Sequence, residues 1–226
     1  MSSEPKLSVG VVSADLGHFA QDLQKLAEAG ADYLHIDVMD GDFVPMILDG
    51  GLLLKAIKAN SKLPIDVHLM TYRLEQNIAK FSGASLITVQ AEATVHIHRA
   101  VQQIKSLGAK AGLALNPASP LSLIDEILPE LELVLLVAIN PAFPNQAFVS
   151  STLAKIKRLK EIREKRKLNF KIAVDGGVSL ANAKSIAAAG ADIIVSGSAI
   201  FKNGEITKNI DAFRSEFKQG LKEIGE

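Results

Sequence analysis

The sequence contains no cysteine among its 226 residues, which excludes disulfide bonds and thiolate chemistry. Any metal bound by this chain must therefore take nitrogen and oxygen ligands. Neither positive nor negative charge is in excess, because 25 basic residues balance 25 acidic ones. A balanced chain has no broad electrostatic field to attract nucleic acid or an anionic membrane surface. We expect neither as a partner.

Long apolar runs are absent too. None approaches the roughly 20 residues that a helix needs to cross a bilayer. The first six residues, MSSEPK, are polar and lack the apolar core of a signal peptide. These features predict a cytoplasmic protein. The apolar content is nevertheless high, at 48%, so the chain can form one large α/β domain with a full core.

Short apolar runs alternate with amphipathic stretches along the whole chain. The runs are nearly continuous, which is typical of parallel strands buried on both faces. We predict strands at 7–12, 33–39, 64–70, 86–89, 110–115, 133–139, 170–174 and 192–196. Examples of the predicted helices are 18–29, 95–107, 151–166 and 180–189.

The joints between helices and strands repeat one phrase. EAGAD at 28–32 and AAGAD at 188–192 each place a glycine just past a helix, where the left-handed conformation costs least. Eight such units would average about 28 residues each, close to the size of a compact barrel. We therefore predict a single-domain (β/α)8 TIM barrel with parallel strands over residues 1–226. A doubly wound open sheet is the alternative.

Histidine and aspartate occur where three of these strands end. His35 and Asp37 share one strand, His68 ends another, and Asp175 ends a third. Polar groups at buried strand ends must be paired or bound, because their desolvation is costly. In a barrel these ends meet on the face that carries chemistry. The four residues predict a metal site, and the two carboxylates could equally be the acid and base of a proton-transfer enzyme.

The motifs around these residues closely resemble ribulose-phosphate 3-epimerase. They are HIDVMDGDFVP at 35–45, DVHLM at 66–70 and VDGG at 174–177, supported by SAD at 13–15, GLALNP at 112–117 and GS at 197–198. The resemblance implies a divalent metal (Zn, Mn or Fe) on His35, Asp37, His68 and Asp175. It also implies that Asp37 and Asp175 act from opposite faces of a phosphorylated ketose: one takes the C3 proton, the metal stabilises the enediolate, and the other returns a proton.

The resemblance further implies a set of substrate-binding residues. Methionines would form an apolar floor, backbone N–H groups would meet the phosphate, and a loop would close on the substrate. The residues concerned are Met39, Met70, Ala142, Phe143, Asn145, Gly176, Gly177, Gly197 and Ser198. Barrels of this kind often assemble, so we expect a homo-oligomer.

Several positions depart from the family pattern. Gly10 replaces a serine, Val137 a methionine, Gln90 a histidine, Met46 an asparagine, and Pro144 a glycine of the closing loop. The metal and acid–base positions match, so we predict retained proton transfer with altered or weaker substrate recognition. The substrate is then D-ribulose 5-phosphate or another ketose phosphate, such as a hexulose phosphate. A non-catalytic sugar-phosphate-binding barrel is a further alternative.

One other enzyme class is a lower-ranked interpretation. A decarboxylase or aldol-type synthase of a related barrel would need an Asp-x-Lys-x-x-Asp phrase, which the HIDVMD segment at 35–40 lacks. Asp40 and Asp42 are predicted to form turns rather than to act in catalysis. The remaining histidines (His18, His96 and His98) are predicted to have no functional role, and the basic segment 155–167 is predicted to be a solvated helix face.

Overall fold

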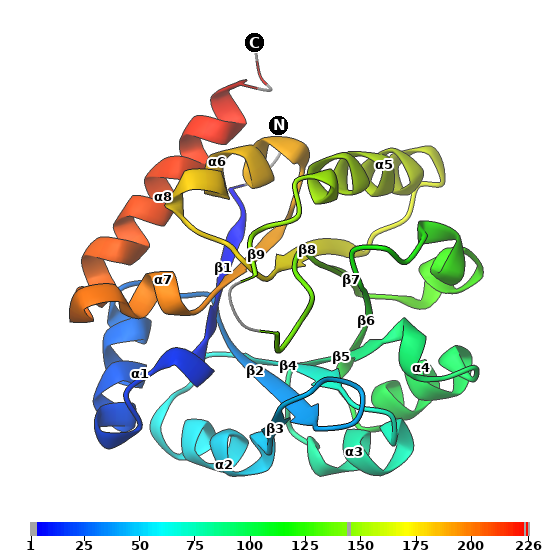
Figure 1. Ribbon diagram of the computed structural model, residues 1–226, viewed down its shortest axis with the longest axis horizontal. Coiled ribbons are helices and arrows are strands. Elements are labelled where there is room, and N and C mark those ends of the chain that lie inside the picture. Colours follow the sequence, from blue (N-terminus) through cyan, green and yellow to red (C-terminus); the bar gives the residue numbers. More distant parts are fainter. Residues whose placement is uncertain (1–3, 144–145, 224, 226) are drawn as a thin grey trace.

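A closed barrel of parallel strands forms the centre of the computed structural model, which describes residues 4–143, 146–223 and 225 (Figure 1). Its strands are β1 (Lys6–Gly10), β2 (Tyr33–Asp40), β4 (Ile65–Met70), β5 (Leu86–Gln90), β6 (Lys110–Leu115), β7 (Leu133–Val137), β8 (Lys171–Asp175) and β9 (Ile193–Ser196). Each pairs with its neighbour in parallel, and β1 pairs with both β2 and β9, which closes the ring. The predicted (β/α)8 barrel is confirmed, and the open-sheet alternative is wrong.

Helices surround the barrel (Figure 1). They are α1 (Phe19–Glu28), α2 (Gly50–Asn60), α3 (Leu74–Lys80), α4 (Ile97–Ser106), α5 (Ser151–Lys165), α6 (Leu180–Ala189), α7 (Ser198–Phe201) and α8 (Ile206–Glu223). Between β6 and β7 the connection is a 3-10 helix, η4 (Leu121–Glu130). Pro120 precedes η4 and Pro129 lies within it, where the missing N–H removes a backbone donor that an α-helix would use.

Smaller elements lie near the strand ends. Short 3-10 turns are η1 (Val11–Ser13), η2 (Leu16–His18), η3 (Ala91–Ala93) and η5 (Lys202–Gly204). The two-residue strand β3 (Ile47–Leu48) folds back antiparallel on the end of β2. The predicted first strand was too long, because Val11 already belongs to a 3-10 turn. Among the described residues, no helix combines the length and apolar character needed to cross a bilayer.

The interior of the barrel is divided into an apolar and a polar half. The apolar half lies mainly on β5–β9 and consists of Leu86, Ala114, Leu133, Leu135, Val137, Ala173, Ile193 and Val195. The polar half lies on β1, β2, β4 and β5 and consists of the buried side chains Ser8, His35, Asp66, His68, Thr88 and Gln90. A larger apolar core fills the space between the strands and the helices. Burial favours pairing of such groups, and Ser8 and His35 pair with Asp66 and His68 with Gln90, whereas the hydroxyl of Thr88 has no hydrogen-bond partner among the described residues.

Candidate active site

Three strands deliver the predicted cluster to the carboxyl-terminal mouth of the barrel. His35 and Asp37 come from β2, His68 from β4, and Asp175 is the last residue of β8. Asp37 lies opposite His68 in the register of β2 and β4, so these two side chains stand at one level. Residues two apart on a strand point to the same face, which turns His35 and Asp37 together into the barrel.

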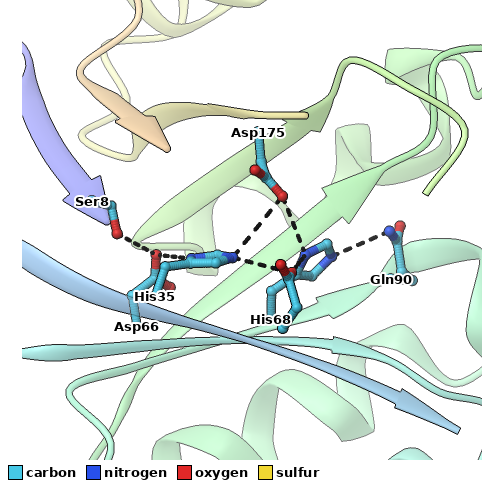
Figure 2. Close-up of polar contacts among 7 residues, drawn as sticks. Ser8, His35, Asp66, His68, Gln90 and Asp175 are labelled. Carbon is cyan, nitrogen blue, oxygen red and sulfur yellow. Dashed lines mark hydrogen bonds and ion pairs between the residues drawn. The ribbon is translucent and has the colours of Figure 1, made fainter. Parts of the chain in front are cut away.

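The four side chains converge within a small volume, and Figure 2 labels three of them, His35, His68 and Asp175. Oδ1 of Asp37 lies 3.3 Å from Nε2 of His35 and 3.2 Å from Nδ1 of His68. Oδ2 of Asp175 lies 4.0 Å from Nε2 of His35 and 3.9 Å from Nδ1 of His68. One ligand atom from each residue lies within 4.8 Å of all the others.

This geometry fits a divalent cation. Ligands bonded at about 2.1 Å in a tetrahedral arrangement lie about 3.4 Å from one another, similar to the separations seen here. Two imidazoles and two carboxylates are also a donor set that zinc, manganese and iron accept. The residues present therefore match the predicted metal, whereas their roles stay predictions.

The pKa values of His35, Asp37 and Asp175 are shifted in different directions. Burial lowers the pKa of His35, but the charges of Asp66 and Asp37 outweigh it and raise that pKa well above its usual value. Burial raises the pKa of Asp37, but the charge of His35 and its hydrogen bond bring that pKa well below the usual range. Burial and the charge of Asp37 together raise the pKa of Asp175 to about 6. Without metal, the cluster thus contains one firmly ionised carboxylate and one that readily binds a proton.

Asp66 fixes the orientation of His35 and was not predicted as a site residue. Its Oδ2 lies 2.8 Å from Nδ1 of His35 and accepts a hydrogen bond from Oγ of Ser8 at 3.3 Å. With Nδ1–H bound to the carboxylate, Nε2 of His35 is free to face Asp37 and a metal. The signal was present in the sequence, because Asp66 precedes His68 by two residues and therefore shares its face.

Several of the predicted substrate residues lie at or just after the carboxyl ends of the strands, and their role stays a prediction. Met39 and Met70 are register partners at the ends of β2 and β4. Gly176 and Gly177 follow β8 with φ of 97° and 65°, and a Cβ on Gly177 would lie 2.9 Å from the backbone N of Phe148. Gly197 and Ser198 follow β9, where Gly197 packs against Gly10 so closely that a Cβ would meet the carbonyl oxygen of Gly10 at 3.0 Å.

The loop after β7 is described in part. Phe143 is 53% exposed, and Ala142 has a positive φ of 64°. The predictions for Pro144 and Asn145 lie outside the described residues.

Asp40 forms turns, as predicted. Its Oδ1 accepts from the backbone N–H groups of Asp42 and Phe43, and its Oδ2 accepts from that of Tyr72 at 2.8 Å. Asp40 thereby ties the loop after β2 to the loop after β4. These bonds bring the pKa of Asp40 below its usual value although partial burial opposes them.

The remaining histidines lie outside the cluster. His18 and His96 precede α1 and α4, and His98 pairs with Glu130 on the surface at 3.2 Å. One residue of the basic segment 155–167 differs from the prediction. Lys155 is only 5% exposed, and the prediction of a solvated face is wrong for this residue.

Comparison with known proteins identifies relatives over almost the whole chain. A family model described as "Ribulose-phosphate 3 epimerase family" matches residues 6–201. The ribulose-phosphate 3-epimerase of Bacillus subtilis is 41% identical over 212 residues, covering 92% of this chain and 98% of the relative. The chloroplastic ribulose-5-phosphate-3-epimerase of Arabidopsis thaliana is 43% identical over 199 residues, covering 86% and 71%.

Solved structures of low sequence identity share the fold. KGPDC from Streptococcus mutans in complex with D-R5P superposes with a TM-score of 0.71 at 16% identity, over 96% of this chain and 99% of the other. A 3-hexulose-6-phosphate synthase superposes with a TM-score of 0.64 at 19% identity, over 93% and 99%. These likenesses support the barrel and carry no argument about the reaction.

Proposed function

The chain belongs to the ribulose-phosphate 3-epimerase family, and we propose that it interconverts D-ribulose 5-phosphate and D-xylulose 5-phosphate by moving the proton at C3. The observation that carries this proposal is the buried cluster itself. Asp37, Asp175 and two histidines place one ligand atom each within 4.8 Å of the others, at the barrel face where substrates bind. A barrel that only bound sugar phosphate would have no need for two desolvated carboxylates.

Epimerisation needs a base on one face of C3 and an acid on the other. In the proposed reaction, one carboxylate takes the C3 proton, and the electrons of the C–H bond move toward the C2 carbonyl to give an enediolate. The second carboxylate, carrying a proton, delivers it to the opposite face and inverts the centre. Asp37 and Asp175 suit this pairing because their pKa values are moved in opposite directions, to well below the usual range and to about 6.

A divalent cation on His35, Asp37, His68 and Asp175 would supply positive charge beside both carboxylates and the substrate oxygens. The protein contributes the rest. Asp66 and Gln90 hold the two imidazoles, Met39 and Met70 offer a polarizable apolar floor, and the glycines after β8 and β9 offer backbone N–H groups to a phosphate.

The experiment is C3 exchange of D-ribulose 5-phosphate in heavy water, followed by NMR with added metal and with chelator. A two-carboxylate mechanism predicts that the first xylulose 5-phosphate formed carries deuterium at C3 while the remaining ribulose 5-phosphate retains protium. We expect Asp37→Asn and Asp175→Asn each to abolish turnover, and the surface variant Asp211→Asn to match the wild type. Appreciable turnover in either cluster variant would disprove the assigned roles.

Epimerisation of a larger ketose phosphate, such as a hexulose phosphate, is a second candidate. It is favoured by two small residues, Gly10 at the end of β1 and the buried Val137 at the end of β7. The same exchange assay distinguishes the substrates, because each is supplied separately. Metal identity, assembly into a homo-oligomer and a cytoplasmic location stay predictions, which metal analysis, light scattering and fractionation would test.

A further inference from the structure

His68 contacts the cluster through one ring nitrogen and the barrel interior through the other. Its Nδ1 faces Asp37, whereas its Nε2 lies 3.2 Å from the side-chain amide of Gln90 (Figure 2). Both side chains are fully buried. A neutral imidazole carries one proton, and only the nitrogen without it can bind a metal. The partner of Nε2 therefore decides whether Nδ1 of His68 is available as a ligand.

Two acceptors determine how the amide of Gln90 is oriented. With its NH2 group turned away from His68, the amide donates to Oε2 of Glu92 at 2.8 Å and to the carbonyl oxygen of Ala114 at 3.2 Å. A carboxylate and a carbonyl accept hydrogen bonds and cannot donate, so neither can face the amide oxygen. We assign the oxygen to the His68 side on this ground. It then accepts from Nε2–H, which leaves the lone pair of His68 on Nδ1.

Glu92 is itself held in place from the mouth of the barrel. Its Oε1 accepts from the backbone N–H of Asn116 at 2.8 Å and from the hydroxyl of Ser119. Lys155, almost fully buried on α5, donates to the carbonyl oxygens of Asn116 and Pro117 at 2.9 and 3.4 Å. This chain of contacts extends from α5, which follows the loop after β7, to the histidine on β4.

We propose that Gln90 and Glu92 are positioning residues, which hold His68 in the Nε2–H tautomer so that Nδ1 can bind the metal. The inference rests on the proposed function only in taking the cluster to be a metal site. His35 is held by a carboxylate and His68 by a neutral amide. The neutral amide adds no negative charge to a site where Asp37 and Asp175 belong to the cluster and Asp66 contacts His35.

The first test removes the acceptor and keeps the shape. Gln90→Met replaces the amide by an unbranched side chain of similar volume, and Glu92→Gln lets the Gln90 amide turn either way. Glu130→Gln is the matched control, because Glu130 accepts only surface contacts from His98 and Lys105 among the described residues. Thermal unfolding of each variant shows whether it is folded.

Two readouts report on His68 without any sugar substrate. The chain contains five histidines, so ¹⁵N spectra of histidine-labelled, metal-free protein at pH 8 resolve each ring, and a His68→Gln spectrum assigns this one. We expect one Nε2–H tautomer in the wild type and in Glu130→Gln, and a mixture in Gln90→Met and Glu92→Gln. Mn²⁺ affinity, measured by titration, should fall about 10- to 100-fold in Gln90→Met.

The proposal is wrong if Gln90→Met and Glu92→Gln both keep the wild-type His68 tautomer, or if the wild type shows Nδ1–H. It is equally wrong if Mn²⁺ binds Gln90→Met within twofold of its wild-type affinity. Failure of the proposed function gives a different result. A wild type with the Nε2–H tautomer and tight Mn²⁺ binding, but without C3 exchange, would refute the epimerase and leave the positioning role intact.

Discussion

Replacing Asp175 by asparagine should stabilise the metal-free protein while it destroys the proposed activity. Asp175 is buried next to the ionised Asp37, and its pKa rises from 3.8 to about 6. An aspartate whose pKa is raised by folding prefers its protonated form in the native state. It therefore costs stability at every pH at which the unfolded chain would release that proton.

The sign and size of this cost follow from the two pKa values. The penalty is absent well below pH 3.8, grows as the pH rises toward 6, and is constant above about pH 7. At its full extent the difference of about 2.2 pKa units corresponds to at most about 3 kcal/mol. Asparagine has nearly the same shape and no charge, so Asp175→Asn should recover about 2–3 kcal/mol at pH 8 and little at pH 4.

Asp37 provides a control of opposite sign. Its carboxylate lies 3.2–3.3 Å from nitrogens of His35 and His68, whereas that of Asp175 lies 3.9–4.0 Å away. The nearer group has the lowered pKa, and its ionised form stabilises the fold above its unfolded pKa. Asp37→Asn should therefore destabilise the metal-free protein at pH 8, by about 2 kcal/mol for the charged hydrogen bond to His35 that it loses.

The assay is unfolding of metal-stripped protein by urea and by heat between pH 4 and 8, followed by circular dichroism. In a chain of this length, 2–3 kcal/mol should raise the melting temperature by roughly 5–10 °C. Addition of Mn²⁺ should reverse the order, because the wild type has the complete ligand set and binds the ion more tightly. The reasoning is refuted if Asp175→Asn is less stable than the wild type at pH 8 without metal, or if both substitutions shift stability in the same direction.

Three further predictions concern the same mouth of the barrel. Metal affinity should rise with pH, up to tenfold per pH unit for each proton released. The ion must displace the proton of His35, whose pKa is raised, and below about pH 6 also that of Asp175. Calorimetry in buffers of different ionisation enthalpy counts these protons. Asp40→Ala removes an acceptor shared by three backbone N–H groups, so we expect the free energy of unfolding to fall by about 1–2 kcal/mol and KM to rise. An unchanged midpoint of urea unfolding would contradict this. Gly177→Ala should lower the free energy of unfolding by about 1–3 kcal/mol and weaken phosphate binding, because φ is 65° and the new Cβ would meet the backbone of Phe148. Thermal unfolding measures the first effect, and inhibition by inorganic phosphate measures the second.

The sequence predicted the fold and the location of the cluster because both depend on simple periodicities. Buried parallel strands have continuous apolar runs, and their carboxyl ends meet on one face. The predicted strand at 110–115 and the predicted helix at 180–189 agree with β6 and α6 to the residue. His35, Asp37, His68 and Asp175 could be placed together for the same reason.

Features that depend on tertiary contacts escaped prediction. β3 is two residues long and exists only through its pairing with the end of β2. Lys155 lies on the buried face of α5 with Ile156 and Leu159, and the carbonyl oxygens of the neighbouring loop explain how a lysine is accommodated there. The assignment of Asp66 and Gln90 to the two histidines needs the strand register and the direction of each side chain, which a single sequence does not contain.

The division of the barrel interior explains which positions are free to change. Val137 belongs to the apolar half, where exchange for another apolar residue of similar size costs less than about 1.5 kcal/mol. In the polar half, the loss of one partner leaves a buried group unsatisfied, at about 1–3 kcal/mol or more if it is charged. Gln90 is the departure from the family pattern within that half, and its amide retains an acceptor for Nε2 of His68. Substrate contacts on the apolar side can therefore vary independently of the proton-transfer cluster, whereas a change beneath the histidines must preserve the hydrogen bond that orients them.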